Sequence, residues 1–326
     1  KSIELSHKAL NIAQKHKLLK EEAEVLLDLS GFYNKQRKYD TALESAQKAL
    51  VIAKKLKNPR LEYRALGMLR DIYQKQGKYQ KALEFAQKVY ALVQKENLGL
   101  YKITTLTYLS ESYLNLGDTV KAESAAKQAL NIAKKSRNYN GEVLGLLRLT
   151  QVYKFQGKYE EGIETAQKSL QISRQNKFFI GEIAASVLLS EIYEQLGNYQ
   201  KVIAVAQPYI IQARKINQRD KEAQLLINLG NAYRVIGEYT KSKQLIEQGL
   251  KIARDLKNPS LELIGLNNLG SYYSSIKDYQ KALELTQQSL KIAKKLESPP
   301  LLISPQFSLG DIYSSLGDYQ KSRDYY

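Results

Sequence analysis

Residues 229–239 read Leu-Gly-Asn-Ala-Tyr-Arg-Val-Ile-Gly-Glu-Tyr, and variants of this stretch recur along the chain. Its first tyrosine belongs to a series that returns at every fortieth position without insertion or deletion. The members of this tyrosine series are Tyr33, Tyr73, Tyr113, Tyr153, Tyr193, Tyr233, Tyr273 and Tyr313. A fixed period of this length is typical of a chain built from stacked copies of one small unit. The period therefore predicts a repeat solenoid, in which function belongs to a surface shared by several units.

Each unit is predicted to be a pair of helices, as residues 60–99 illustrate. Apolar residues recur at helical spacing over 60–76, which predicts a helix with one apolar face. Gly77 follows, where the end of a helix needs a residue in the left-handed conformation. A second helix is predicted to begin near Gln80, with its own apolar stripe. One such pair cannot bury both stripes alone, but a stack of pairs can.

The turns carry their own sequence signals. The glycine of the first turn is replaced by Arg37 and Lys277 in two units, and the same geometry there costs about 1 kcal/mol. The other turn places a capping side chain before proline, as at the start of a helix. It does so in Asn58-Pro59, Asn258-Pro259 and Ser298-Pro299. Two prolines break the pattern: Pro208 predicts a kinked second helix, and Pro305 predicts a shortened first helix that begins after Ser304.

These residues carry a family resemblance. Residues 229–233 and 237–239 resemble the signature of the tetratricopeptide repeat, and the 40-residue period resembles the kinesin-light-chain-like arrays of bacterial signalling proteins. The resemblance implies an all-α, right-handed superhelical solenoid of antiparallel helix pairs over residues 1–326. In this frame 1–19 hold the second helix of a truncated repeat, 20–299 hold seven complete repeats, and 300–326 hold a truncated C-terminal repeat. The chain is thus expected to be a window from a longer protein.

Catalytic chemistry finds little support in the sequence. Cysteine is absent, and the two histidines, His7 and His16, are spaced neither as a metal pair nor as a nucleophile–base couple. The glycines stand singly at helix ends rather than in a phosphate-binding loop. We therefore expect a protein that is not an enzyme and needs no cofactor or metal. The lack of cysteine and of an apolar run of membrane-spanning length predicts a cytoplasmic protein without a transmembrane segment.

The formal net charge of +17 raises the question of nucleic acid. One basic series lies near the ends of the second helices, where cations meet the helix dipole favourably: Lys54, Lys134, Arg174, Arg214, Arg254 and Lys294. A second basic series lies near the starts of these helices, where solubility is the simplest explanation: Lys81, Lys121, Lys201, Lys241, Lys281 and Lys321. Because no aromatic-plus-arginine motif of an RNA reader is present, we expect weak, salt-sensitive attraction rather than specific nucleic-acid binding.

The resemblance implies a concave groove lined by the first helices. In that family the residue two positions before each signature tyrosine points into the groove. This series reads Gly31, Asp71, Glu111, Gln151, Glu191, Asn231, Ser271 and Asp311. The middle of the groove is therefore predicted to be acidic, and its carboxylates would attract basic side chains.

Towards the C-terminal half the predicted groove residues become rich in amides and hydroxyls. They include Asn228, Asn231, Arg234, Asn267, Asn268 and Ser271. Carboxamides carry both a donor and an acceptor, so they can pair with the backbone of an extended peptide. Exposure alone also explains a polar residue at any single one of these positions. The paired Lys and Asn of the carboxylate-clamp subfamily are not in register, so capture of a free C-terminus is not expected.

The sequence therefore predicts a non-enzymatic interaction module. Its concave groove would bind a peptide or helical segment of another protein, or of another domain of the same parent chain. One alternative is a peptide-sensing regulatory domain that controls an attached effector domain. A second alternative is a basic surface that docks on nucleic acid or on an anionic membrane. The sequence leaves the oligomeric state and the identity of the partner open.

Overall fold

The structure, a computed structural model, describes residues 2–296 and 299–326 and is all-α in this part of the chain. It divides into two compact units, unit 1 (Lys1–Arg148) and unit 2 (Leu149–Tyr326), and the division falls within helix α8 (Tyr139–Phe155). The other helices of unit 1 are α1 (Ser2–Lys15), α2 (Leu19–Lys35), α3 (Tyr39–Lys55), α4 (Pro59–Lys75), α5 (Tyr79–Lys95), the 3-10 turn η1 (Gly99–Tyr101), α6 (Lys102–Asn115) and α7 (Thr119–Lys135). Those of unit 2 are α9 (Tyr159–Gln175), α10 (Phe179–Gln195), α11 (Tyr199–Lys215), α12 (Arg219–Val235), α13 (Tyr239–Asp255), α14 (Pro259–Ser275), α15 (Tyr279–Lys295), α16 (Pro299–Ser315) and α17 (Tyr319–Tyr325).

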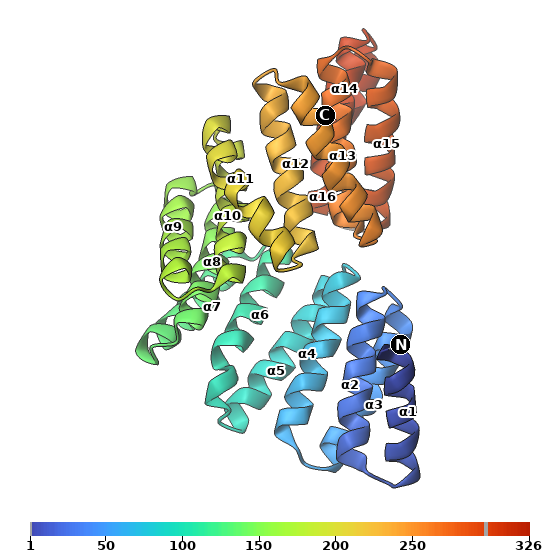
Figure 1. Cartoon of the computed structure of the whole chain (residues 1–326), viewed down its shortest axis with the longest axis vertical. Helices are drawn as coiled ribbons and strands as arrows, with labels where there is room; N and C mark the ends of the chain where they lie inside the picture. The colour runs from blue at the N-terminus through green and yellow to red at the C-terminus, as the bar shows by residue number, and fades with distance from the viewer. Residues whose placement is uncertain (1, 297–298) are drawn as a thin grey trace. The chain divides into compact units, whose positions relative to one another are not determined.

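Within each unit the chain is a stack of helix pairs, as Figure 1 shows. Consecutive helices pack on each other, for example α2 on α3 and α12 on α13. The first helices of neighbouring pairs also touch, α2 with α4 in unit 1 and α10, α12, α14 and α16 in succession in unit 2. The prediction of an all-α solenoid of helix pairs is therefore confirmed, and the first helices form one face of each unit.

The turns hold their geometry with residues in the left-handed conformation. At the end of α4, the Gly77 N–H donates to the Gln74 carbonyl at 3.1 Å and the Lys78 N–H donates to the Tyr73 carbonyl at 3.0 Å. Gly77 has a φ of 76°, and Arg37 and Lys277 adopt φ of 59° and 65° at the equivalent positions. Arg37 and Lys277 therefore keep the turn geometry of the glycines they replace, and the cost of about 1 kcal/mol at each stays a prediction. The structure adds that the other turn is also left-handed and uses no glycine there: Lys17, Lys57, Asn97, Arg137, Lys177, Asn217 and Lys257 all have positive φ.

Substitution of Lys277 by glycine is expected to raise the free energy of unfolding by about 0.5–1 kcal/mol, because glycine adopts this φ without a Cβ penalty. Lys277 is exposed, so little packing is lost. The measurement is urea unfolding followed by circular dichroism. The control is Lys291→Gly, at an exposed position inside α15, which should lower stability by about 1 kcal/mol. A loss of stability in both variants would contradict the prediction.

Proline behaves differently at helix starts and inside helices. The Asn58 side chain accepts hydrogen bonds from the Arg60 and Leu61 backbone N–H groups, and the Asn258 side chain accepts one from the Leu261 N–H, which confirms both predicted caps. The third predicted cap, Ser298, lies outside the described residues. The prediction for Pro305 is wrong: α16 already begins at Pro299 and continues through Pro305 to Ser315. One missing backbone hydrogen bond does not start a new helix there, and α11 likewise continues through Pro208.

The second basic series packs on the tyrosine series. Each of its lysines places its ammonium group over the ring of the tyrosine eight positions earlier. The distances to the ring centres are 4.6–5.5 Å for the pairs Lys81–Tyr73, Lys121–Tyr113, Lys201–Tyr193, Lys241–Tyr233, Lys281–Tyr273 and Lys321–Tyr313. An ammonium group over an aromatic face is attracted by the negative face of the ring. These lysines therefore help to join the two helices of a pair, a role that solubility alone does not describe.

Part of the first basic series bridges one helix pair to the next. Arg174, Arg214 and Arg254 each lie near a glutamate eight positions later, on the following first helix. The distances from Nε to a carboxylate oxygen are 3.9 Å for Glu182, 2.8 Å for Glu222 and 3.0 Å for Glu262. Arg219 also pairs with the buried Glu222, at 3.0 Å. These arginines therefore have partners within the chain in addition to the helix dipole.

Candidate functional site

The candidate site is the first-helix face, defined as the surface formed by α2, α4 and α6 in unit 1 and by α10, α12, α14 and α16 in unit 2. In unit 1 this face holds Asp71 on α4 and Glu111 on α6. In unit 2 it holds Glu191 on α10. It also holds two groups of predicted site residues: Asn228, Asn231 and Arg234 on α12, and Asn267, Asn268 and Ser271 on α14. Gln151, the remaining predicted site residue, lies on α8 and is half-buried.

The predicted acidic residues of unit 1 are held by arginines that the sequence reading missed. Arg70, whose side chain is 6% exposed, donates from Nη2 to Asp71 at 2.5 Å and from Nη1 to Glu111 at 2.6 Å. Arg148 approaches the same Glu111 carboxylate at 3.2 Å. The Arg70 guanidinium also lies 4.0 Å from the centre of the Tyr108 ring. Asp71 and Glu111 are thus brought together through one buried cation.

The two carboxylates respond oppositely to this arrangement. Partial burial raises the pKa of Asp71 above its ordinary value, although Arg70 acts in the other direction. Burial also acts to raise the pKa of Glu111, but Arg148 and Arg70 outweigh it and hold this pKa below its ordinary value. Glu111 is therefore the carboxylate of the cluster that holds its charge more firmly, and Asp71 is the one that is protonated more readily as the pH falls.

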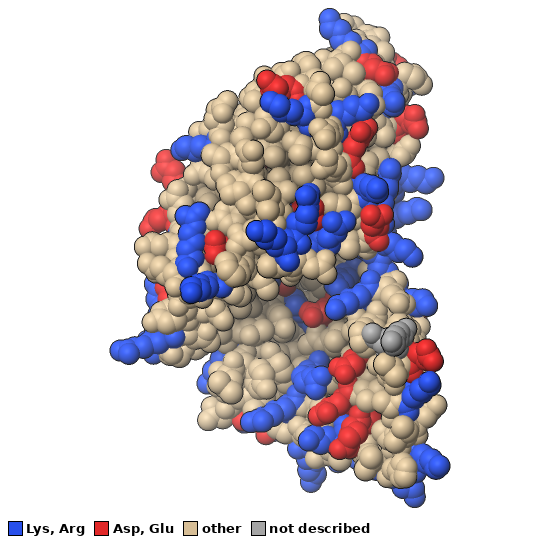
Figure 2. Space-filling model, viewed as in Figure 1, with Lys and Arg blue, Asp and Glu red and all other residues tan. Residues whose placement is uncertain are grey.

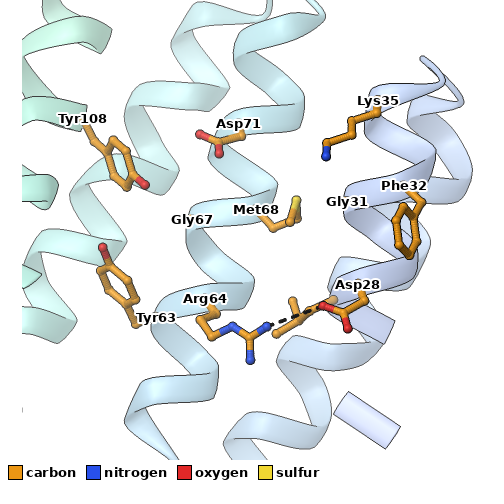
Figure 3. Close-up of a pocket in the computed structure, with 11 residues that line it drawn as sticks. Asp28, Gly31, Phe32, Lys35, Tyr63, Arg64, Gly67, Met68, Asp71 and Tyr108 are labelled. Atoms are coloured by element: carbon orange, nitrogen blue, oxygen red, sulfur yellow. Dashed lines mark ion pairs between the residues drawn. The ribbon is translucent and has the colours of Figure 1, made fainter. Parts of the chain in front are cut away.

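A hollow of about 390 Å³ opens beside this cluster, on the first-helix face of unit 1. Figure 3 shows Met68 in its middle, Tyr63, Tyr108 and Asp71 on one side, and Lys35 reaching in from α2 on the other. The remaining lining residues are Leu27, Asp28, Gly31, Phe32, Arg64 and Gly67. Arg64 and Asp28 form an exposed ion pair at 3.8 Å. The hollow thus combines apolar lining residues with hydrogen-bond donors and acceptors.

Two glycines leave room for this hollow. A Cβ at Gly31 would meet only the Met68 Cε at 3.6 Å, and a Cβ at Gly67 would meet only the Tyr108 ring at 4.0 Å. Both glycines lie inside helices, where glycine is less stable than alanine by about 1 kcal/mol. On the far wall, Tyr63 packs on Tyr101 with ring centres 4.1 Å apart, and burial raises the pKa of its hydroxyl.

In unit 2 the acidic position is again paired. The Glu191 carboxylate accepts hydrogen bonds from Lys154 Nζ at 2.5 Å and from Gln224 Nε2 at 2.9 Å. One turn further along α10, burial raises the pKa of Glu194, whose carboxylate accepts a hydrogen bond from the Asn231 amide. Glu191 and Glu194 thus connect α10 to its neighbours.

The asparagines of unit 2 join neighbouring first helices. Asn228 is 5% exposed and donates to Ser190 Oγ at 3.0 Å, and Asn267 is also 5% exposed and donates to Ser304 Oγ at 2.9 Å. Asn231, at 8% exposure, lies between Glu194 and Arg234. The donors of these three amides are therefore engaged inside the unit. Of the predicted amide and hydroxyl set, Asn268 and Ser271 are half-exposed.

The partner residues that were not predicted, Arg70, Ser190 and Ser304, stand at sequence positions related to the predicted site residues. Arg70 precedes Asp71 by one position, and Glu111 follows Asp71 at one full period, so a cation beside this pair is visible in the sequence. Ser190 and Ser304 each lie about one period before or after the asparagine they contact. Pairing these residues from the sequence requires knowledge of which helix faces which.

Several other features of the described part of the chain bear on function. Among residues 2–296 and 299–326, no group of three or more His, Asp or Glu side chains is placed to hold a metal ion. In the same ranges, no helix is long and apolar enough to cross a membrane. Figure 2 shows acidic side chains interspersed with basic ones on the visible faces of both units.

The chain belongs to the tetratricopeptide repeat family. One model described as tetratricopeptide repeat matches residues 21–95, 64–135, 221–295 and 261–326, and a second model of the same description matches residues 146–176. A search of curated proteins found no match.

Solved structures share the fold at low sequence identity. A Rap protein complexed with competence and sporulation factor is 17% identical, with a TM-score of 0.69 over 99% of this chain and 94% of that chain. The Rap conjugation gene regulator of plasmid pLS20, in complex with the Phr* peptide, is 13% identical, with a TM-score of 0.70 over 98% of this chain and 93% of that one. A signal transduction ATPase with a tetratricopeptide repeat sensor, from Pyrococcus horikoshii, is 19% identical, with a TM-score of 0.59. That match covers 98% of this chain but only 50% of the ATPase.

Proposed function

We propose that this chain is a non-enzymatic protein-interaction module whose first-helix face binds a peptide segment, from another protein or from its own parent chain. The observation that carries the proposal is the hollow of about 390 Å³ on the first-helix face of unit 1. Its volume falls within the range of binding pockets, and apolar surface with a few polar groups at the rim is the usual character of such sites.

The lining of this hollow fits part of a peptide. Met68, Leu27 and Phe32 offer apolar contact to a side chain. Lys35 has no carboxylate within 4 Å among the described residues, so its ammonium group is available to a peptide carbonyl. The Tyr63 and Tyr108 hydroxyls and the Asp71 carboxylate supply hydrogen-bonding groups on the opposite side (Figure 3).

The structural relatives support the same function. One is in complex with a peptide and another carries its repeats as a sensor. The sensor favours a regulatory version of the proposal, in which peptide binding controls an attached effector. Small-angle scattering with and without bound peptide tests this version, because a sensor should change its radius of gyration and a passive scaffold should not.

Docking on nucleic acid or membrane through the basic series has less support. Lysines of the second basic series already lie on tyrosine rings, and arginines of the first pair with glutamates. A charge that is engaged within the chain contributes less to an external anionic surface.

Filling the hollow is expected to weaken peptide binding at least tenfold. The variant is Gly31→Leu, because a side chain at this position enters the hollow and meets only Met68 at its Cβ. A displayed library of random peptides is selected on the wild-type protein, and fluorescence anisotropy gives the Kd of an enriched peptide for each variant.

The matched control is Gly99→Leu, which adds the same side chain where a Cβ has nothing within 4 Å and which lies outside the hollow. Its Kd should equal that of the wild type. The proposal fails if the wild type enriches no peptide, and this use of the hollow fails if Gly31→Leu binds as tightly as the control.

A further inference from the structure

Arg234 is a half-buried cation whose hydrogen-bond partners are neutral. From α12, its Nε donates to Asn231 Oδ1 at 3.0 Å and its Nη1 donates to Ser275 Oγ, on α14, at 3.1 Å. Among the described residues, no carboxylate oxygen lies within 4 Å of its guanidinium group. Taking a charge out of water without a counter-charge costs free energy. In agreement, burial lowers the pKa of Arg234.

The surroundings hold this guanidinium in place. Asn231 donates its amide N–H to Glu194, which turns its carbonyl oxygen towards Arg234. Ser275 accepts from Arg234 and donates to the Ser271 backbone carbonyl at 2.9 Å. The Nη2 group and one N–H of Nη1 remain without a partner in the described part of unit 2. A fixed guanidinium group with free N–H groups is prepared for a planar anion, because little freedom is lost on binding.

Arg234 borders a hollow of about 230 Å³ on the first-helix face of unit 2. Its other lining residues are Ser271, Ser274, Ser275, Ser308, Asp311 and Ile312. Serine hydroxyls donate hydrogen bonds to anions. The Asp311 carboxylate lies more than 4 Å from the guanidinium group and accepts a hydrogen bond from the Tyr326 hydroxyl at 2.5 Å. One guanidinium group beside one carboxylate favours a ligand with a single negative charge over a doubly charged phosphate.

We propose that this hollow binds a carboxylate group of the bound peptide, with Arg234 as its charged donor and the hydroxyls of Ser271, Ser274 and Ser308 around it. The inference rests on the proposed function, since it names the chemistry that the first-helix face of unit 2 selects. The carboxylate comes from an aspartate or glutamate side chain or, contrary to the expectation from the sequence, from a peptide C-terminus.

The first test needs no peptide. The probe is sodium acetate, added to the ¹⁵N-labelled chain while the Nε–Hε resonance of Arg234 is followed by NMR. The resonance is assigned from its loss in Arg234→Lys. We expect a saturable shift with acetate and no such shift with sodium chloride at the same ionic strength. Equal, unsaturated shifts with both salts would overturn the proposal.

The second test uses a peptide enriched on the wild-type protein. It is synthesised with a free C-terminus, with an amidated C-terminus, and with each Asp or Glu replaced by Asn or Gln. We expect one of these neutralisations to weaken binding to the wild type about tenfold, and this identifies the source of the carboxylate. The same neutralisation should have no further effect on Arg234→Gln, whereas the exposed control Lys291→Gln should behave like the wild type.

The outcomes separate the two proposals. If no peptide is enriched, the proposed function fails, and the acetate titration still decides whether the anion site exists. If peptides are enriched but every neutral form binds the wild type as tightly as the parent peptide, the carboxylate proposal fails and the proposed function stands.

Discussion

Replacement of Arg70 by methionine is expected to lower the free energy of unfolding of unit 1 by about 3–5 kcal/mol at pH 7. Methionine retains most of the length of the side chain but removes the cation that joins Asp71 to Glu111. Arg70 is 6% exposed, and the side chains of Asp71 and Glu111 are 40% and 25% exposed, so these two carboxylates regain only part of their hydration in the folded state. Urea unfolding followed by circular dichroism measures it.

The loss should shrink as the pH falls from 7 to 4. Arg70 acts to lower the pKa of Asp71, so its removal raises this pKa further, and protonation of Asp71 on acidification relieves the unpaired charge earlier in the variant than in the wild type. The pKa of Glu111 is lowered, so its contribution to wild-type stability is present above its ordinary range and is lost as the pH falls through the folded value. Both effects reduce the difference in the free energy of unfolding between variant and wild type as the pH falls.

Arg64→Met is the matched control, because Arg64 lies on the same helix in an exposed ion pair and should contribute less than about 1 kcal/mol. A loss in Arg70→Met that is independent of pH would assign the effect to packing and contradict the electrostatic account. A loss no larger than that of Arg64→Met would contradict the importance of the cluster altogether.

Replacement of Gly230 by valine is expected to destabilise unit 2 by about 3 kcal/mol. A Cβ at this position would lie 2.6 Å from Ile246 Cγ1 and 3.1 Å from both the Ser242 carbonyl oxygen and the Ile246 backbone nitrogen. Two of these three atoms belong to the backbone of α13, so the clash cannot be relieved by a rotamer change. The helices α12 and α13 would have to move apart.

Gly31→Ala is the control for this second variant, since it also replaces a glycine inside a first helix. Its Cβ meets only Met68 at 3.6 Å, so the higher helix propensity of alanine should raise stability by about 0.5–1 kcal/mol. Thermal and urea unfolding of both variants measure the two effects. Destabilisation of similar size at the two positions would show that close helix contact is not the cause at Gly230.

The sequence predicted the fold well because each repeat encodes its own helix ends. The period of the tyrosine series, the turn at Gly77 and the caps at Asn58 and Asn258 all depend on residues near one another in the chain. The error at Pro305 has the same origin, because the prediction considered only the local preference of proline for the start of a helix. In the structure the helix has already begun at Pro299 and continues through Pro305.

The candidate site was less accessible to sequence reasoning. The prediction that Asp71 and Glu111 lie on one face needed the period and the family resemblance, whereas their shared partner Arg70 depends on a side chain that reaches between two helices. The amide cluster shows the same limit, because Asn228 and Asn267 are nearly buried against serines of the neighbouring first helices. The peptide-binding role of the predicted groove residues stays a proposal.

The spacing of the side-chain contacts has a consequence for how the chain folds. Lysine and tyrosine meet across eight positions, and the longer contacts Arg70–Glu111 and Arg234–Ser275 span 41 positions, about one repeat. Because contacting residues lie close together in the sequence, the chain has a low contact order. Closing such short loops requires little loss of chain entropy before the contacts form. We therefore expect folding to start at any helix pair and to spread to its neighbours on the microsecond-to-millisecond timescale of helical proteins, without waiting for the two termini to meet.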